Sequence, residues 1–177
     1  MTRSKTLDIT TIALFAALIS ILSPFAIPIP ISTVPISLAT LALYITVYIA
    51  GTKKAFISTL IYLLLGLIGI PVFAGFTGGF GKLAGPTGGF LIGYLPMVLF
   101  IGLIIDHFDN IGIKISAYIL GTLLLYSFGC LWFVFLGDGS TLAAAISLCV
   151  LPFIPGDIAK IAVTFAVCPA LKKRLAR

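Results

Sequence analysis

Six long apolar runs, separated by short polar or proline- and glycine-rich connections, constrain this chain more than any other feature. A helix that crosses a bilayer needs about 20 mainly apolar residues, within a range of about 17–25. The chain is 60% hydrophobic and 9% charged, whereas an average soluble domain is about 25% charged. A soluble domain of 177 residues has too much surface to bury so many apolar side chains. We therefore predict a single transmembrane domain, residues 1–177. The runs are residues 8–22, 34–50, 54–70, 88–105, 113–136 and 157–171.

A seventh apolar run, residues 141–151, is too short to cross and is bounded by Gly139 and Pro152. We expect a short outer or re-entrant helix there, which is tolerated where protein or water covers its ends. The alternating pattern of a transmembrane β-barrel is absent from the sequence. The predicted fold class is an all-α integral membrane protein with six transmembrane helices.

The basic residues predict the orientation. With six spans and both termini in the cytoplasm, nine of the eleven lysines and arginines face inward, and Lys82 and Lys160 face outward. Cytoplasmic loops of membrane proteins carry an excess of lysine and arginine. We therefore predict a multi-pass protein of the cell membrane with both termini cytoplasmic. The net charge of +6 is then a topology signal and does not point to nucleic acid.

One opposite-charge pair lies between two apolar runs, in the segment PGDIAK at residues 155–160. Pro155 suits the first turn of a helix, where its missing N–H would be unpaired in any case. The i, i+3 spacing then puts Asp157 and Lys160 on one face. A charge at membrane depth costs roughly 2.5–3.5 kcal/mol on insertion scales unless it meets a partner or a cavity. We expect the two groups to meet each other or a ligand.

The predicted outer connections are long and irregular, whereas the inner ones are short. Eight glycines fall between residues 75 and 93, where they permit positive φ and close backbone approach, and no GK[ST] phosphate-binding motif accompanies them. Phe76 and Phe90, interleaved with these glycines, are candidates for an apolar slot, although phenylalanine also commonly faces lipid. We predict a pocket that opens outward beneath residues 23–35, 71–87 and 137–156, with Asp157 and Lys160 at its polar end.

The first span carries small residues at Ala13, Ala16 and Ala17. Such faces let helix backbones approach closely. Two interpretations stay open, packing within the bundle and docking to a second membrane protein. Gly89 and Gly93 form a similar GxxxG pattern, for which helix packing is the favoured interpretation.

An enzyme is disfavoured. The chain has no glutamate, and its one histidine, His107, falls in a predicted cytoplasmic turn. Convergent acids, bases or metal ligands at membrane depth are therefore missing from the pattern. The three cysteines are far apart in apolar runs without CxxC spacing, as expected of packing residues. We predict no catalytic residue, metal or cofactor.

Three segments resemble a known family, the BioY family of biotin-specific substrate-binding (S) components of energy-coupling factor (ECF) transporters. They are GPTGGFLIGY at residues 85–94, PGDIAK at 155–160 and VPISL at 34–38, and the resemblance runs from about Ile12 to Leu171. The GPTGG and PGDxxK runs together are specific, whereas Ala13 and Ala17 match S components in general. Ala39 stands where glutamine is frequent in the family, which leaves open what the first outer loop contributes to polar contacts.

The resemblance implies a six-helix S-component fold that captures biotin from outside and delivers it inward. It also implies a lipid-embedded partnership with a transmembrane coupling subunit, docked at the small-residue face, and with two cytosolic ATPase subunits. Asp157 suits the ureido N–H groups of biotin, and Lys160 suits Asp157, the ureido oxygen or the carboxylate. Lys82 is the other outer cation for the carboxylate. The candidate substrate-binding residues are Asp157, Lys160, Lys82, Thr87, Gly88, Phe76, Phe90 and Tyr94.

Two alternatives stay open. S components for thiamine or riboflavin share the architecture, although the two motifs favour biotin. A channel or structural membrane protein is a different class, but no ring of polar residues repeats along any span.

Overall fold

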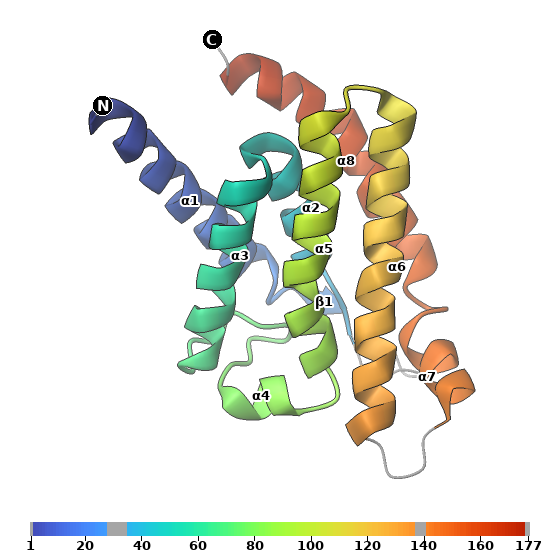
Figure 1. Ribbon diagram of the computed structural model, residues 1–177. Coiled ribbons are helices and arrows are strands. Elements are labelled where there is room, and N and C mark those ends of the chain that lie inside the picture. The colour runs from blue at the N-terminus through green and yellow to red at the C-terminus, as the bar shows by residue number, and fades with distance from the viewer. Residues whose placement is uncertain (1, 28–34, 137–140, 176–177) are drawn as a thin grey trace.

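The computed structural model describes residues 2–27, 35–136 and 141–175, and helices make up most of that part of the chain (Figure 1). A short antiparallel sheet pairs Ala26 with Ser37 and Ile27 with Ile36. In chain order the elements are α1 (Thr2–Leu22), β1 (Ala26–Ile27), β2 (Ile36–Ser37), α2 (Ala39–Ala50), α3 (Thr52–Leu67), α4 (Phe80–Ala84), α5 (Gly88–His107), α6 (Ile111–Leu136), α7 (Leu142–Cys149) and α8 (Ile154–Leu175).

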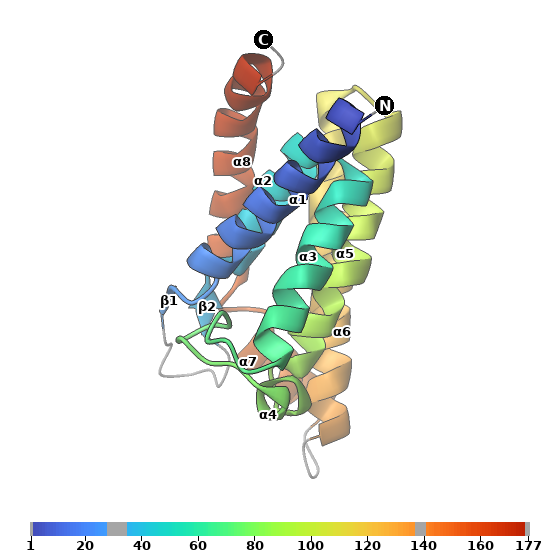
Figure 2. The ribbon, with the colours of Figure 1, turned by 90° about the vertical axis from the view of Figure 1, so that its left-hand side faces the viewer.

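The two ends of the bundle differ. Both termini lie at one end, together with the α2–α3 and α5–α6 connections, whereas β1, α4 and α7 lie at the other (Figure 1). We call these the terminal end and the loop end. Helix α1 runs obliquely to α3 and packs against α2 and α3 (Figure 2). The long, irregular connections are therefore gathered at the loop end, as the sequence predicts.

Each predicted apolar run overlaps a helix, but the helices differ in length. Four in the described part of the chain are long and apolar enough to cross a membrane. Helix α2 is apolar but has 12 residues, and α3 has 16. The short run 141–151 forms α7, as expected. The four helices of spanning length cover Lys5–Leu22, Gly88–His107, Ile111–Leu136 and Ile154–Arg174.

The predicted start of the second run was wrong, because α2 begins at Ala39 rather than at residue 34. Ile36 and Ser37 pair instead with β1, and the Leu38 N–H donates to the Phe25 carbonyl at 3.1 Å. These bonds hold the backbone extended before the helix begins. Of the predicted roof, residues 28–34 and 137–140 lie outside the described residues.

Glycines let α5 and α6 pack closely. A Cβ on Gly89 would lie 2.2 Å from Trp132 Cβ and 2.7 Å from the Phe128 carbonyl oxygen. A Cβ on Gly93 would lie 3.0 Å from side-chain atoms of Leu125 and Phe128. The helix-packing interpretation of this GxxxG pattern is confirmed, because close backbone approach is what small residues allow.

Polar contacts tie helices together at the terminal end. Asp106, near the end of α5, accepts hydrogen bonds from the Thr52 backbone N–H at 3.1 Å and from the Thr52 hydroxyl at 2.5 Å. Lys54 of α3 forms an ion pair with Asp8 of α1 at 2.7 Å. His107 is exposed, and its Nδ1 lies 2.7 Å from the Leu103 carbonyl oxygen.

Candidate functional site

The buried charged pair is the centre of the site. Helix α8 begins at Ile154, so Pro155 lies in its first turn as predicted, and Asp157 lies there too. Lys160 Nζ is 2.9 Å from Asp157 Oδ1. The two residues are 8% and 4% exposed, although both would ionise in water. A carboxylate in the first turn of a helix is stabilised by the helix dipole.

Two side chains from other helices complete the pair. Thr40 of α2 donates to Asp157 Oδ1 at 3.2 Å and accepts from Lys160 Nζ at 2.7 Å. Tyr126 of α6 donates to Asp157 Oδ2 at 2.6 Å. Buried charges are tolerated when they are paired and hydrogen-bonded. These contacts therefore make it possible to keep both ions in an apolar interior.

The hydrogen-bond count leaves room for a ligand. An ammonium has three donors, and a carboxylate has about four lone-pair sites. In the described part of the chain, Lys160 uses two donors for side chains, and Asp157 accepts three side-chain bonds. One donor of Lys160 and one acceptor site of Asp157 therefore stay available.

A small cavity of about 50 Å³ lies against this pair. Its walls are mostly apolar and aromatic, and its residues with polar groups come from five elements, β2, α2, α5, α6 and α8. Phe90 and Phe153 stack along it with ring centroids 6.5 Å apart. The lining residues are Pro35, Ser37, Thr40, Phe90, Tyr94, Leu125, Tyr126, Phe153, Asp157 and Lys160.

A second cavity, of about 40 Å³, adjoins the first and shares four of its residues, Pro35, Ser37, Phe90 and Tyr94. Its polar side chains include Lys82 of α4 and Thr87. The Thr87 Oγ1 is buried and has no hydrogen-bond partner in the described structure. Buried polar atoms are normally hydrogen-bonded, so an unpaired hydroxyl on a cavity wall is free to bond a ligand.

The structure gathers most of the candidate residues at these two cavities but excludes two. Phe76 is 63% exposed and contacts Phe25, so it lines neither cavity. Gly88 lines neither of them, because its backbone packs against Leu83 and Trp132. An apolar aromatic residue in a glycine-rich segment faces a ligand, the core or lipid equally well by pattern, so the sequence does not separate Phe76 from Phe90.

Near Ala39, two polar residues contribute to the lining of the first cavity. Ala39 is buried at the start of α2 and lines neither cavity. Ser37 and Thr40 line the cavity beside Asp157. Ser37 Oγ is occupied within the loop, because it donates to the Ser23 carbonyl and accepts from the Ala39 N–H.

Sequence reasoning missed three residues. No local sequence pattern marks Thr40 or Tyr126 as a site residue. Each becomes a hydrogen-bond partner of Asp157 only because helices that are distant in the sequence pack together. Trp132 is the third, and its Nε1 donates to the Gly85 carbonyl at 3.0 Å. This bond anchors the turn that presents Thr87 to the second cavity.

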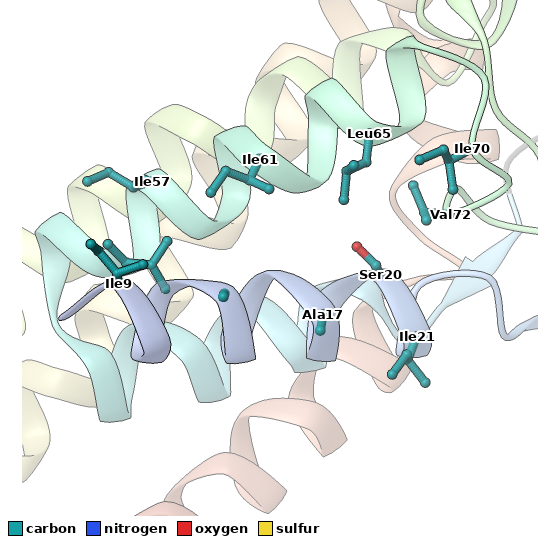
Figure 3. Close-up of a pocket in the computed structure, with 11 residues that line it drawn as sticks. Ile9, Ala17, Ser20, Ile21, Ile57, Ile61, Leu65, Ile70 and Val72 are labelled. Carbon is teal, nitrogen blue, oxygen red and sulfur yellow. The ribbon is translucent and has the colours of Figure 1, made fainter. Parts of the chain in front are cut away.

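The small-residue face of α1 divides into two parts. Ala13 and Ala17 line an apolar groove between α1 and α3 (Figure 3). Ala16 is only 3% exposed and packs inside the bundle, so of the three alanines only Ala13 and Ala17 are accessible from the groove. Ser20 also lines the groove, and its buried Oγ has no hydrogen-bond partner in the described structure.

The fold and the site define a class, a helical membrane protein that holds a hydrogen-bonded charged pair beside an aromatic cavity. The BioY family model matches residues 1–177. Biotin transporter BioY2 of Lactococcus lactis is 45% identical over 137 residues, which cover 76% of this chain and 74% of that protein. A probable biotin transporter BioY of Pyrococcus horikoshii is 35% identical, over 95% and 98% of the two chains.

A solved structure is also similar to this chain in fold. The crystal structure of the S-component for biotin from an ECF-type ABC transporter matches with a TM-score of 0.87 and 31% sequence identity. The match covers 98% of this chain and 94% of that one. This chain therefore belongs to the BioY family, a transporter family rather than an enzyme family, and the resemblance predicted from the sequence is confirmed.

Proposed function

We propose that this protein is the biotin-binding S component of an ECF-type vitamin uptake transporter. The observation that carries the proposal is that Lys160 and Asp157, which line an aromatic cavity, keep one donor and one acceptor site free of side-chain bonds. The ureido group of biotin presents the complementary N–H donors and C=O acceptor. Ligand sites are typically apolar with a few convergent polar groups.

The second cavity suits the other end of biotin. The ligand has a fused bicycle at one end and a carboxylate tail at the other, and the two cavities adjoin through shared aromatic residues. We assign the bicycle to Asp157 and Lys160, and the carboxylate to Lys82 and the unpaired hydroxyl of Thr87. The half-buried Lys82 has no ion-pair partner among the described residues, so its charge is available.

The bound state must be wider than this structure. The cavities have volumes of about 50 and 40 Å³, whereas sites for drug-sized ligands typically have about 300–1,000 Å³. Side chains that separate the two cavities must therefore move apart when biotin enters. Phe90 and Tyr94 line both cavities and are the side chains placed to do so.

The cellular setting follows from the charge distribution and the family. We propose six membrane-crossing helices, with the terminal end in the cytoplasm and the site opening outward at the loop end. Lys5, Lys53, Lys54, Lys114 and Lys172 belong to elements that meet at the terminal end, which supports this orientation. A transmembrane coupling subunit, docked near Ala13 and Ala17, and two cytosolic ATPase subunits would complete the transporter.

Calorimetric titration of the purified, ligand-stripped protein with biotin tests the proposal, with thiamine and riboflavin as controls. We expect tight one-to-one binding of biotin alone. Asp157→Asn and Lys160→Ala should weaken it strongly. Asp109→Asn and Lys114→Ala are matched controls, because they break an ion pair of 3.1 Å at the terminal end. Binding of another vitamin, or unchanged binding in both site variants, would overturn the assignment.

A neutral-tail analogue separates the two ends of the ligand. Biotin amide keeps the bicycle but lacks the carboxylate. We expect Lys82→Ala to weaken biotin binding but to leave amide binding nearly unchanged. Asp157→Asn should weaken both ligands. If Lys82→Ala weakens both ligands equally, the carboxylate does not bind at Lys82.

A further inference from the structure

The largest cavity among those described lies away from the biotin site. It is a groove of about 660 Å³ between α1 and α3, at the flank of the bundle (Figure 3). Ile57, Ile61 and Leu65 of α3 face Ala13 and Ala17 of α1 across it, and Ser20 is its one polar lining residue. Because lipid tails are as apolar as leucine, such a groove in a membrane accepts an acyl chain without selectivity.

The groove continues into a second, charged cavity. That cavity has a volume of about 420 Å³ and shares Ile9, Ile12 and Ile57 with the groove. It extends to the terminal end, where three lysines and two aspartates surround it. These charged residues are Lys5, Lys53, Lys54, Asp8 and Asp106. The combined cavity is therefore apolar along most of its length and charged at one end.

Two of the lysines are free to bind an anion. Lys54 pairs with Asp8 at 2.7 Å, and Asp106 accepts both Thr52 bonds. Lys5 and Lys53 are exposed and have no ion-pair partner in the described part of the chain. Asp106 keeps its charge, but the three lysines outnumber the two aspartates, so the net charge around this cavity is positive.

We propose that this groove binds an anionic phospholipid, with one acyl chain between α1 and α3 and the phosphate at Lys5 and Lys53. Basic pockets between transmembrane helices on the cytoplasmic side are known to take anionic headgroups. The apolar groove matches the acyl chain of such a lipid, and the adjoining charged cavity matches its phosphate. The inference is independent of biotin binding, and a protein docked at Ala13 and Ala17 would have to displace the lipid.

Native mass spectrometry of the delipidated protein tests the headgroup contact. Dioleoylphosphatidylglycerol is compared with dioleoylphosphatidylcholine, which has the same chains and no net charge. We expect the first lipid to be preferred, and Lys5→Gln/Lys53→Gln to reduce that preference by roughly 30-fold, about fivefold for each lysine. The matched control is Lys173→Gln/Arg174→Gln, which removes two exposed charges from the last turn of α8.

A second pair of variants tests the acyl-chain contact. Ala13→Phe fills the groove, whereas Leu14→Phe adds a ring at a neighbouring position that is 64% exposed and does not line the groove. We expect Ala13→Phe to reduce the bound phosphatidylglycerol at least tenfold and Leu14→Phe to leave it unchanged. Thermal unfolding of each variant establishes that both are folded.

Three outcomes would overturn the proposal. One is an equal loss of preference in the control double variant, which would indicate a general charge effect. Another is equal binding of the two phospholipids by the parent protein. The third is unchanged lipid binding in Ala13→Phe, together with lost association of a purified coupling subunit, which would make the groove a protein-docking surface alone.

Discussion

At the scale of single residues, the protein buries a charged pair by hydrogen-bonding both ions to side chains of other helices. Asp157 and Lys160 pair on one helix, while Thr40 and Tyr126 bind them from two others. Removing one partner of a buried ion pair leaves an uncompensated charge, which costs about 3–5 kcal/mol. The same four side chains border the cavity, so the groups that stabilise the pair also shape the proposed ligand site.

Tyr126→Phe should destabilise the protein. The substitution removes the 2.6 Å hydrogen bond to Asp157 Oδ2 and keeps the ring. Hydrogen bonds to charged groups contribute about 1.5–3 kcal/mol, so we expect the free energy of unfolding to fall by that amount. The Tm in detergent measures the change. Tyr48→Phe is the control, because no described hydrogen bond involves the Tyr48 hydroxyl, and equal shifts would mean that the bond contributes nothing.

At the scale of elements, α5 and α6 form the wall on which the site depends. Phe90 and Tyr94 of α5 and Leu125 and Tyr126 of α6 all line the first cavity. The close approach of these helices rests on glycine, because side chains from α6 occupy the space where a Cβ on α5 would lie.

Gly89→Ala should therefore destabilise the protein. Its Cβ would meet Trp132 Cβ at 2.2 Å and the Phe128 carbonyl at 2.7 Å, and overpacking typically costs about 1–3 kcal/mol. Gly81→Ala in α4 is the matched control, because nothing lies within 4 Å of its Cβ. Thermal unfolding should show a lower Tm for the first variant and an equal or higher Tm for the second. A Tm for Gly89→Ala at or above the parent value would contradict the packing argument.

Trp132→Phe should weaken biotin binding with little change in stability. The variant keeps an aromatic ring against α5 but loses the 3.0 Å bond from the indole N–H to the Gly85 carbonyl. A neutral hydrogen bond contributes about 0.5–1.5 kcal/mol, so affinity should fall by roughly 2- to 13-fold as the turn at Thr87 loosens. Calorimetry measures this change. Unchanged affinity would show that the bond does not position the turn.

At the scale of the whole molecule, the two ends carry different features. The terminal end has short connections and helix ends rich in lysine, and the loop end has the irregular segments and both small cavities. The proposed anionic-lipid contact and the proposed biotin site therefore lie at opposite ends. An uptake protein needs this polarity, because it must bind on one side of the membrane and couple on the other.

Cysteine labelling tests the orientation. We expect Gly81→Cys to react with a membrane-impermeant maleimide in intact cells, and Lys53→Cys to react only after permeabilisation. The native cysteines are buried. Burial also raises the pKa of the Cys149 thiol to about 11, so at pH 7 its reactive thiolate is scarce and background labelling stays low. The opposite labelling pattern would invert the topology.

Local sequence patterns by themselves determined the fold class and the position of the charged pair on one helix. Apolar composition and run length predicted a helical membrane protein, and i, i+3 spacing put Asp157 and Lys160 on one face of a helix. These properties depend on residues close together in the chain, because helix period and hydropathy are local. The family motifs lie within single segments, so their resemblance was visible as well.

Only the tertiary structure decided which residues bind the charged pair and which line the cavities and the groove. Thr40 lies 117 residues from Asp157 and Tyr126 lies 31 residues from it, so no local pattern pairs them. Phe76 and Phe90 look alike in the sequence, yet one is exposed and the other lines both cavities. Ala16 and Ala17 are neighbours, yet one is buried and the other lines the groove. Which face of an element meets a partner depends on how distant helices pack, and that arrangement exists only in the folded chain.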